Sequence, residues 1–236
     1  MAFARTKVAA LVLLIALAAA CRAAPVDDWA NLARYREANA ALANVDPQRV
    51  VFMGDSITEG WAGQPFVHDN PHFVDRGISG QTTPQMLVRF RSDVLQLKPA
   101  IVHIMGGTND VAGNTGPETE DEIFSYIVGM VQLAEANRIK VILASVPPTA
   151  DFPWKPGLDP APKIRRLNAR LKAYANSHAI IYADYWSTLA AGSGGMKAEY
   201  SEDGVHPNAR GYAAMRPIAD AALAAAMRQT QTTAQP

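Results

Sequence analysis

Short, unbroken runs of apolar residues recur along the chain and alternate with segments whose apolar residues fall three or four positions apart. An unbroken run is typical of a strand that is covered on both faces, as in a parallel sheet. The runs predict five strands, at residues 49–53, 73–76, 100–105, 140–146 and 179–182. Alternating strands and helices predict a three-layer α/β/α sandwich around a mostly parallel five-stranded sheet, with right-handed crossovers.

The three-to-four spacing predicts the helices. It is found over residues 86–97, 123–134, 164–174 and 213–227. Pro217 is expected to kink or split the last of these helices, because proline removes a helical hydrogen bond. A further amphipathic helix is predicted over residues 27–43, with Trp29, Leu32 and Leu42 near one face.

The chain has 236 residues, which suits one α/β domain with a full hydrophobic core. It contains no internal repeat and no stretch with the composition of a domain linker. We predict an N-terminal segment with its helix at residues 21–46, the main domain at 47–228 and a disordered tail at 229–236.

The first 20 residues have the pattern of a secretory signal, which is removed on export. Arg5 and Lys7 precede an apolar run from Val8 to Ala20. That run is shorter than the roughly 20 residues of a membrane-spanning helix, so a membrane anchor is the less favoured alternative. The pattern predicts export to the periplasm or cell envelope of a bacterium.

Cys21, the only cysteine, directly follows this segment. A chain with one cysteine forms no intramolecular disulfide, so the exported protein depends on its core for stability. The stretch LAAAC resembles the processing site of bacterial lipoproteins, although Ala18 stands where that pattern has leucine. Lipid attachment at Cys21 and plain cleavage into the periplasm both stay open.

The charge pattern argues against a nucleic-acid partner. The chain has 22 Lys and Arg against 22 Asp and Glu, without a local run of basic residues. Hydrophobic residues make up 49% and charged residues 19%, a balance that excludes a disordered chain.

Polar, glycine-rich stretches lie where ligands bind in such folds. GDSITEG, GISGQTT, GGTND and SVPPTADFPW follow the first four predicted strands, and SEDGVHPN precedes the last helix. Ligands of open α/β sheets bind at the carboxyl ends of the strands. We therefore expect the Ser, Asn, Asp and His side chains of these stretches at one edge of the sheet.

Ser56, His206 and Asp203 are candidates for a nucleophilic site. A serine nucleophile needs a base that takes its proton and a carboxylate that orients this base. The backbone N–H groups of Ser56 and Gly80, together with the side-chain amide of Asn109, are candidates for stabilising an oxyanion. The alternative for Ser56 is a helix N-cap, a common role for a serine that follows a strand.

Other polar and aromatic residues of these stretches have less specific interpretations. Asp55 and Asp110 are expected to be structural, bonding backbone N–H groups. His103 lies inside an apolar strand pattern and is expected to be a hydrogen-bonded core residue. Phe152 and Trp154, in the loop after the fourth strand, are candidates for lining an acyl or sugar site.

Four blocks of the sequence resemble the SGNH/GDSL family of esterases and lipases, and they occur in the family's order. The blocks are GDSITEG with Ser56, GISGQTT with Gly80, GTND with Asn109, and DGVH with Asp203 and His206. The resemblance implies a flavodoxin-like α/β/α sandwich. It also implies ester hydrolysis through a covalent acyl-serine, with no cofactor and no metal.

The substrate and the reaction class have alternatives. The leading hypothesis is a serine-dependent carboxylic ester hydrolase acting on short-acyl esters, such as O-acetyl groups on carbohydrates, because the chain has no long apolar lid segment. Lipase or lysophospholipase activity on lipids is the first alternative. A metal-assisted phosphoesterase would use Asp55, Asp110, Asp203 and His206. The last alternative is a catalytically inactive binding module of the cell envelope.

Overall fold

The protein is built around a five-stranded parallel sheet, which confirms the predicted fold class. The computed structural model describes residues 27–42 and 44–233. The strands lie in the order β2-β1-β3-β4-β5, and every neighbouring pair is parallel. Their bounds are β1 Val50–Gly54, β2 Phe73–Gly77, β3 Ile101–Met105, β4 Lys140–Ala144 and β5 Ile181–Ala183. All five strands therefore have their carboxyl ends at the same edge.

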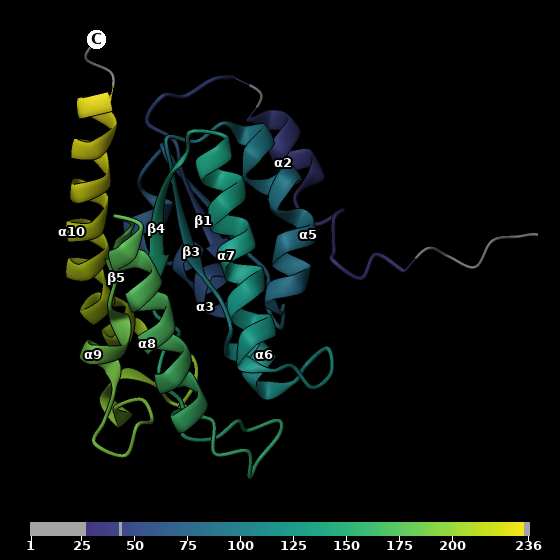
Figure 1. The fold of residues 1–236 in the computed structure, drawn as a ribbon, viewed down its shortest axis with the longest axis vertical. Coiled ribbons are helices and arrows are strands. Elements are labelled where there is room, and N and C mark those ends of the chain that lie inside the picture. Colours follow the sequence, from purple (N-terminus) through teal and green to yellow (C-terminus); the bar gives the residue numbers. More distant parts are fainter. Residues whose placement is uncertain (1–26, 43, 234–236) are drawn as a thin grey trace, which may run out of the picture.

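Helices connect the strands and cover both faces of the sheet (Figure 1). The α-helices are α2 Arg36–Ala41, α3 Ser56–Glu59, α4 Pro65–His68, α5 Thr83–Asp93, α6 Thr108–Ala112, α7 Glu120–Ala136, α8 Ala161–Ser177, α9 Tyr185–Leu189 and α10 Ala209–Thr233. Short 3-10 helices are η1 Gly60–Gly63, η2 Leu95–Leu97 and η3 Ala198–Tyr200. Buried side chains of α5, α7 and α8 pack on one face, and those of α9 and α10 pack on the other.

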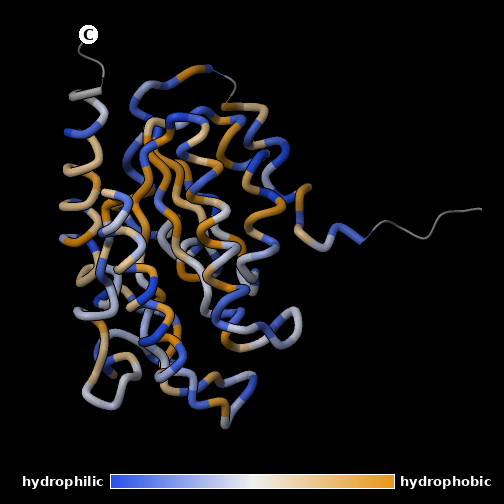
Figure 2. The backbone as a smooth tube through the Cα atoms, in the orientation of Figure 1, coloured by the Kyte–Doolittle hydropathy of each residue, from blue (hydrophilic) through white to orange (hydrophobic). Residues whose placement is uncertain are grey.

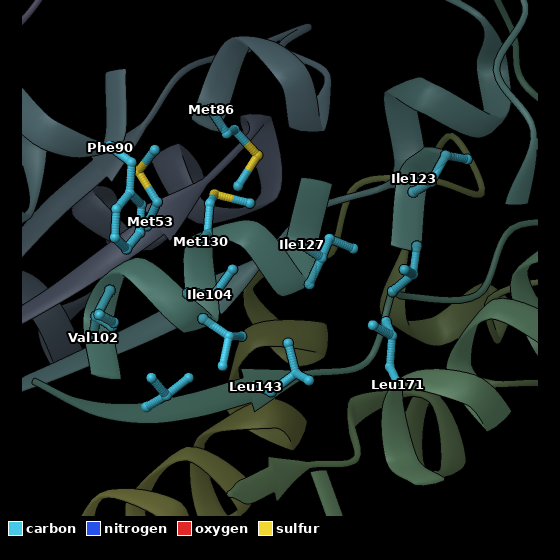
Figure 3. Close-up of a cluster of buried hydrophobic side chains, with 14 of the residues drawn as sticks. Met53, Met86, Phe90, Val102, Ile104, Ile123, Ile127, Met130, Leu143 and Leu171 are labelled. Carbon is cyan, nitrogen blue, oxygen red and sulfur yellow. The ribbon is translucent and has the colours of Figure 1, made fainter. Parts of the chain in front are cut away.

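Successive side chains of each strand alternate between two hydrophobic clusters. Val51 and Met53 of β1 belong to the cluster beneath α5, α7 and α8, whereas Val50 and Phe52 belong to the cluster beneath α10. Figure 3 shows part of the first cluster, and Figure 2 shows the hydrophobic strands at the centre of the fold. Burial on both faces explains why the strand sequences are unbroken apolar runs.

The predicted helix over residues 27–43 is wrong for most of its length. Among residues 27–42, which the structure describes, only α2, Arg36–Ala41, is helical, and turns precede it. The Asp28 carboxylate accepts hydrogen bonds from the N–H groups of Leu32 and Ala33, at 2.7 and 2.8 Å. An aspartate that bonds nearby backbone N–H groups in this way competes with helix formation.

Residues 27–35 lie against the loop that follows β2. Gln81 Nε2 donates to the Ala30 carbonyl at 2.8 Å, and Gln85 Nε2 donates to the Trp29 carbonyl at 2.6 Å. The sequence pattern predicted that this segment lies outside the main domain. In the structure, the segment packs on the domain through these hydrogen bonds.

The last helix, α10, is longer and more continuous than the sequence predicted. Ala209–Thr233 forms one helix with Pro217 inside it, so the proline does not split the helix. Pro217 and Ala213, whose carbonyl loses its helical partner, both lie on the exposed side, where water can bond that carbonyl. The predicted disordered tail, 229–236, is wrong for residues 229–233, which are helical. Its last three residues lie outside the described residues.

The predicted signal peptide, residues 1–20, and Cys21 also lie outside the described residues. Within the part of the chain that the structure describes, no helix is both long and apolar enough to cross a membrane. Export and lipid attachment stay predictions.

A buried arginine joins α5 to two loops at the carboxyl edge of the sheet. The side chain of Arg89 has no exposed surface. Its guanidinium donates to the Gly54 carbonyl at 2.8 Å, to Asp93 Oδ2 at 3.0 Å and to Gln81 Oε1 at 2.5 Å. Gly54 ends β1 and Gln81 belongs to the loop after β2, so one side chain holds the loops that carry two of the predicted site residues.

We expect Arg89→Met to lower the free energy of unfolding by about 3–5 kcal/mol, because the buried Asp93 carboxylate then loses its charge partner. Urea unfolding followed by circular dichroism measures the change. Arg91→Met is the matched control, since Arg91 is exposed on the same helix, and it should change the free energy by less than about 0.5 kcal/mol. Equal unfolding midpoints for the two variants would contradict a stabilising role for Arg89.

Candidate active site

Ser56 lies at the carboxyl edge of the sheet, as the first residue of α3. The N-cap of that helix is Asp55, whose Oδ1 accepts from the Ile57 N–H at 3.0 Å. The structural role predicted for Asp55 is thus confirmed. The alternative interpretation of Ser56 as the N-cap is wrong, because Asp55 occupies that position.

The turn from β1 into α3 has no room for a side chain at Gly54. A Cβ atom there would lie 2.0 Å from Thr58 Oγ1 and 2.5 Å from the Met105 carbonyl oxygen. Glycine allows this close backbone approach. The contact holds α3 against the ends of β1 and β3, and so determines where Ser56 lies relative to the sheet.

The structure brings Ser56, His206 and Asp203 together, although 150 positions separate the serine from the histidine. Ser56 Oγ lies 2.9 Å from His206 Nε2, and His206 Nδ1 lies 2.7 Å from Asp203 Oδ2. In this arrangement an imidazole can take the serine proton while the carboxylate holds its other ring nitrogen. The His206 and Asp203 side chains are 39% and 41% exposed, so the site is open to solvent.

Asp203 organises the turn that carries His206. Its Oδ1 accepts hydrogen bonds from the N–H groups of Val205 and His206, at 2.9 and 2.8 Å. Partial burial alone would raise the pKa of Asp203, but the hydrogen bonds from the His206 ring and from these N–H groups outweigh it and lower the pKa to about 2. Asp203 is therefore ionised at neutral pH.

The predicted oxyanion donors lie around Ser56. Within the described part of the chain, the backbone N–H groups of Ser56 and Gly80 have no protein acceptor. Gly80 has a φ of 79°, which glycine adopts without strain. Buried Asn109 donates from Nδ2 to the Gln81 carbonyl at 2.9 Å. Its contact with Asp55 Oδ2, at 3.5 Å, exceeds a good hydrogen-bond distance, which leaves the second amide hydrogen for another acceptor.

Asn114 belongs to the site but was not predicted from the sequence. Its Nδ2 donates to the Gly80 carbonyl at 3.2 Å and to Asn109 Oδ1 at 2.9 Å. Its Oδ1 accepts from Trp154 Nε1 at 3.2 Å. Asn114 lies in the loop after α6, outside the four sequence blocks, and its nearness to GTND is its only sequence signal.

The two aromatic residues predicted to line the substrate site have different environments. Trp154 is 45% exposed, and its ring centroid lies 6.2 Å from that of His206. Phe152 has no exposed surface and belongs to the hydrophobic core, with its ring centroid 5.1 Å from that of Trp154. The prediction that Phe152 lines the substrate site is therefore wrong, because its ring supports Trp154 and is covered.

Asp110 and His103 are buried side chains with structural partners, as predicted. Asp110 Oδ1 accepts from the Thr83 N–H at 2.9 Å and from the Thr83 hydroxyl, at the start of α5. Burial raises the pKa of Asp110. His103 Nε2 lies 3.0 Å from the Tyr185 hydroxyl, and burial lowers the pKa of His103 to about 3, so its ring is neutral at neutral pH.

The side chains of the metal-dependent alternative have separate roles. Asp55 bonds the start of α3 and Asp110 bonds the start of α5, whereas Asp203 faces the His206 ring. Among the described residues, no three His, Cys, Asp or Glu side chains are grouped so that they could hold a metal ion. The geometry therefore does not support a metal-assisted mechanism through these four residues.

Comparison with known proteins agrees with the fold. A family model described as the GDSL-like Lipase/Acylhydrolase family matches residues 52–214. The chain is also similar to a solved structure from Bacteroides thetaiotaomicron, described as a GDSL-like lipase. That structure has a TM-score of 0.81 and 46% sequence identity, and the similarity covers 84% of this chain and 98% of the other.

Two curated relatives match parts of the chain. A multidomain esterase of Ruminococcus flavefaciens is 26% identical over 177 residues, which are 68% of this chain and 22% of the relative. The lipoprotein YqeF of Bacillus subtilis is 34% identical over 117 residues, which are 42% of this chain and 48% of the relative. The chain thus spans about half the length of one curated relative and less of the other. Because the family match extends over most of the fold and includes every residue of the site, the chain belongs to the GDSL-like lipase/acylhydrolase family.

Proposed function

We propose that the protein is a serine-dependent carboxylic ester hydrolase with Ser56 as nucleophile, His206 as base and Asp203 as the carboxylate that orients the base. The observation that carries the proposal is the continuous contact from Ser56 Oγ to His206 Nε2, at 2.9 Å, and from His206 Nδ1 to Asp203 Oδ2, at 2.7 Å. Family membership supports the same reaction class.

The proposed reaction has two halves. Ser56 Oγ attacks the ester carbonyl carbon while His206 Nε2 takes its proton, and the resulting oxyanion accepts from the Ser56 and Gly80 N–H groups and the Asn109 amide. His206 then donates the proton to the leaving alcohol, and the acyl group stays on Ser56. In the second half, His206 takes a proton from water, the resulting hydroxide attacks the acyl-serine, and the acid is released as Ser56 regains its proton.

For the substrate, we propose a short acyl ester on a carbohydrate. The exposed ring of Trp154 beside His206 offers a flat apolar surface with one polar end, which suits stacking against a sugar ring. A hollow of about 350 Å³ beside Gly80 supports the same class, because its lining includes the exposed polar side chains of Asp27 and Asn31.

The two larger hollows lie away from Ser56. Hollows of about 560 and 740 Å³ lie at the opposite edge of the sheet. Arg49 and Lys98 line the first, just before β1 and β3, whereas Ile139 and Ile180 line the second, just before β4 and β5. Neither can receive the acyl chain of an ester whose carbonyl lies at Ser56. Lipid acylhydrolysis is the alternative that the chain-length series below tests.

We further propose that the protein is exported to the bacterial periplasm or cell envelope and carries lipid at Cys21. The charged and apolar pattern of residues 1–20 supports export. The LAAAC stretch supports lipid attachment, and the similar Bacillus subtilis protein is a lipoprotein.

Ser56→Ala should lower kcat for 4-nitrophenyl acetate by about 10⁴-fold or more, because no other group forms the acyl intermediate. Ser125→Ala removes an exposed hydroxyl on α7 and is the matched control, with an unchanged rate expected. EDTA should not change the rate of the wild type. A rate that survives Ser56→Ala and disappears in EDTA would support the metal-assisted alternative. If the wild-type protein hydrolyses none of the nitrophenyl esters, the result would support the alternative of a catalytically inactive binding module.

The value of kcat/KM should fall at least about tenfold from nitrophenyl acetate to the octanoate, since each added methylene needs apolar space beside the nucleophile. The same enzyme should release acetate from acetylated xylo-oligosaccharides faster than it hydrolyses lysophosphatidylcholine. A specificity constant that rises toward octanoate and palmitate would instead support the lipid alternative.

Asp203→Asn should lower kcat by about 10³–10⁴-fold, because a neutral amide does not hold the required imidazole tautomer. The depressed pKa of Asp203 means that the carboxylate contributes fully above its ordinary titration range and loses its charge only as the pH falls toward 2. Asp203 is therefore fully ionised at pH 8, where the wild type and the variant are compared.

Glu202→Gln is the control for this variant, because it removes the neighbouring exposed carboxylate. It should keep the wild-type kcat. An Asp203→Asn variant that keeps the wild-type kcat at pH 8 would contradict the assignment of Asp203.

A further inference from the structure

Asn114 uses all of its side-chain hydrogen-bonding groups within the site. Its amide nitrogen donates to the Gly80 carbonyl and to Asn109 Oδ1, and its amide oxygen accepts from Trp154 Nε1. Its backbone N–H also donates to the Asn109 carbonyl at 3.0 Å. One asparagine therefore joins two of the proposed oxyanion residues to the exposed aromatic ring beside His206.

The direction of the Asn114 amide depends on Trp154. A side-chain amide has nearly the same shape when its oxygen and nitrogen are exchanged, so its partners decide the orientation. The indole N–H only donates, and the amide atom facing Trp154 must be the oxygen. The amide nitrogen then faces the Gly80 carbonyl and Asn109 Oδ1, as the hydrogen bonds require.

Asn114 in turn determines the direction of the Asn109 amide. Because Asn109 Oδ1 accepts from Asn114, the NH₂ group of Asn109 must point the other way, toward the Gln81 carbonyl. This is the orientation in which the second amide hydrogen of Asn109 can serve an oxyanion. The bond from Asn114 to the Gly80 carbonyl also restrains the residue whose N–H is the second proposed donor.

The loop that carries Trp154 is held firmly enough to act through this bond. Lys155 Nζ donates to the Ala112 carbonyl, at the end of α6, at 2.8 Å. Asp151 Oδ1 accepts from the N–H groups of Phe152 and Gly157, both at 2.9 Å, and the Phe152 ring is buried in the core. The loops after α6 and after β4 project from the same edge of the fold (Figure 1). Trp154 is thus a fixed part of the site.

We propose that Asn114 is a positioning residue that holds the oxyanion donors of Gly80 and Asn109 in place, and that the indole N–H of Trp154 keeps the Asn114 amide in the orientation this requires. The inference rests on the proposed ester hydrolysis, because it assigns these donors to the oxyanion. It gives Trp154 a second role besides contact with substrate, one that affects kcat through Asn114.

Kinetics of single variants on 4-nitrophenyl acetate test the role of Asn114. Asn114→Ala should lower kcat by about 10- to 100-fold with KM changed less than about twofold, since direct loss of one oxyanion donor costs about 10²–10³. Asn114→Asp should show a similar loss, because it keeps the acceptor for Trp154 but has no amide hydrogens. Asn137→Ala should keep the wild-type kcat, because this asparagine is exposed after α7 and its side chain bonds the Leu133 carbonyl, away from the site.

A double-mutant cycle tests the role of the indole N–H. Trp154→Phe keeps an aromatic ring and removes the donor, and it should lower kcat about 3- to 10-fold in the wild-type background. In the Asn114→Ala background the same change should have no further effect on kcat, because the hydrogen bond between Trp154 and Asn114 is already absent. If Trp154 acted only by stacking on substrate, the two losses would multiply, and that result would overturn its proposed action through Asn114.

Two further results separate this inference from the proposed function. If Ser56→Ala is inactive while Asn114→Ala keeps kcat within twofold of the wild type, or changes only KM, the positioning role is wrong and the ester hydrolase stands. If Ser56→Ala keeps the wild-type rate, the proposed function fails and this inference fails with it. Thermal unfolding of each variant checks that a lowered kcat comes from folded protein. If Asn114→Ala does not fold, the kcat of Trp154→Phe tests the positioning role instead.

Discussion

The absence of space for a side chain at Gly54 is the constraint on which the site depends. α3 approaches the ends of β1 and β3 so closely that Thr58 and the Met105 carbonyl would clash with any Cβ at this position. The carbonyl of the same glycine accepts from the buried guanidinium of Arg89. A strand end that is packed on one side and hydrogen-bonded on the other has little freedom, so Ser56 follows it into a fixed position. Catalytic groups need this rigidity to keep their geometry.

The two carboxylates near Ser56, Asp55 and Asp203, have different pKa values because one is buried and the other accepts several hydrogen bonds. Burial raises the pKa of Asp55 to about 6, although its carboxylate accepts the Ile57 N–H. Asp203 is partly exposed and accepts several hydrogen bonds, and its pKa is low. The carboxylate beside the His206 ring is therefore the one that stays negative across the ordinary pH range, as support of a protonated imidazole requires.

Local sequence predicted the sheet and most of the site because both follow from short-range patterns. Unbroken apolar runs indicated each strand, and the rule that ligands bind at carboxyl strand ends grouped Ser56 with Asn109. The pairing of Ser56 with His206 came from the base that a serine nucleophile needs and from the order of the blocks, since no spacing connects residues 150 positions apart. Helix 27–43 was predicted wrongly because the hydrogen bonds of the Asp28 side chain are not visible in a hydrophobic pattern.

Residues that act through loop-to-loop hydrogen bonds could not be predicted in this way. Asn114 and Arg89 contact groups on other elements. The sequence around Arg89 gives no sign of these contacts, and Asn114 is marked only by its nearness to GTND. The burial of Phe152 likewise depends on how its loop folds back onto the core, while Trp154, two positions later, stays exposed. An aromatic loop residue can support the site or contact the substrate, and only the folded loop distinguishes these roles.

Residues 27–35 dock on the loop after β2 and border the proposed substrate site. This segment precedes the part of the chain that the family shares, yet it forms one wall of the hollow beside Gly80. It contributes none of the proposed catalytic groups, but it bonds Gln81, which follows Gly80 in the same loop. Its surface would therefore meet the alcohol portion of the proposed ester, while its backbone helps to hold the loop of one proposed oxyanion donor.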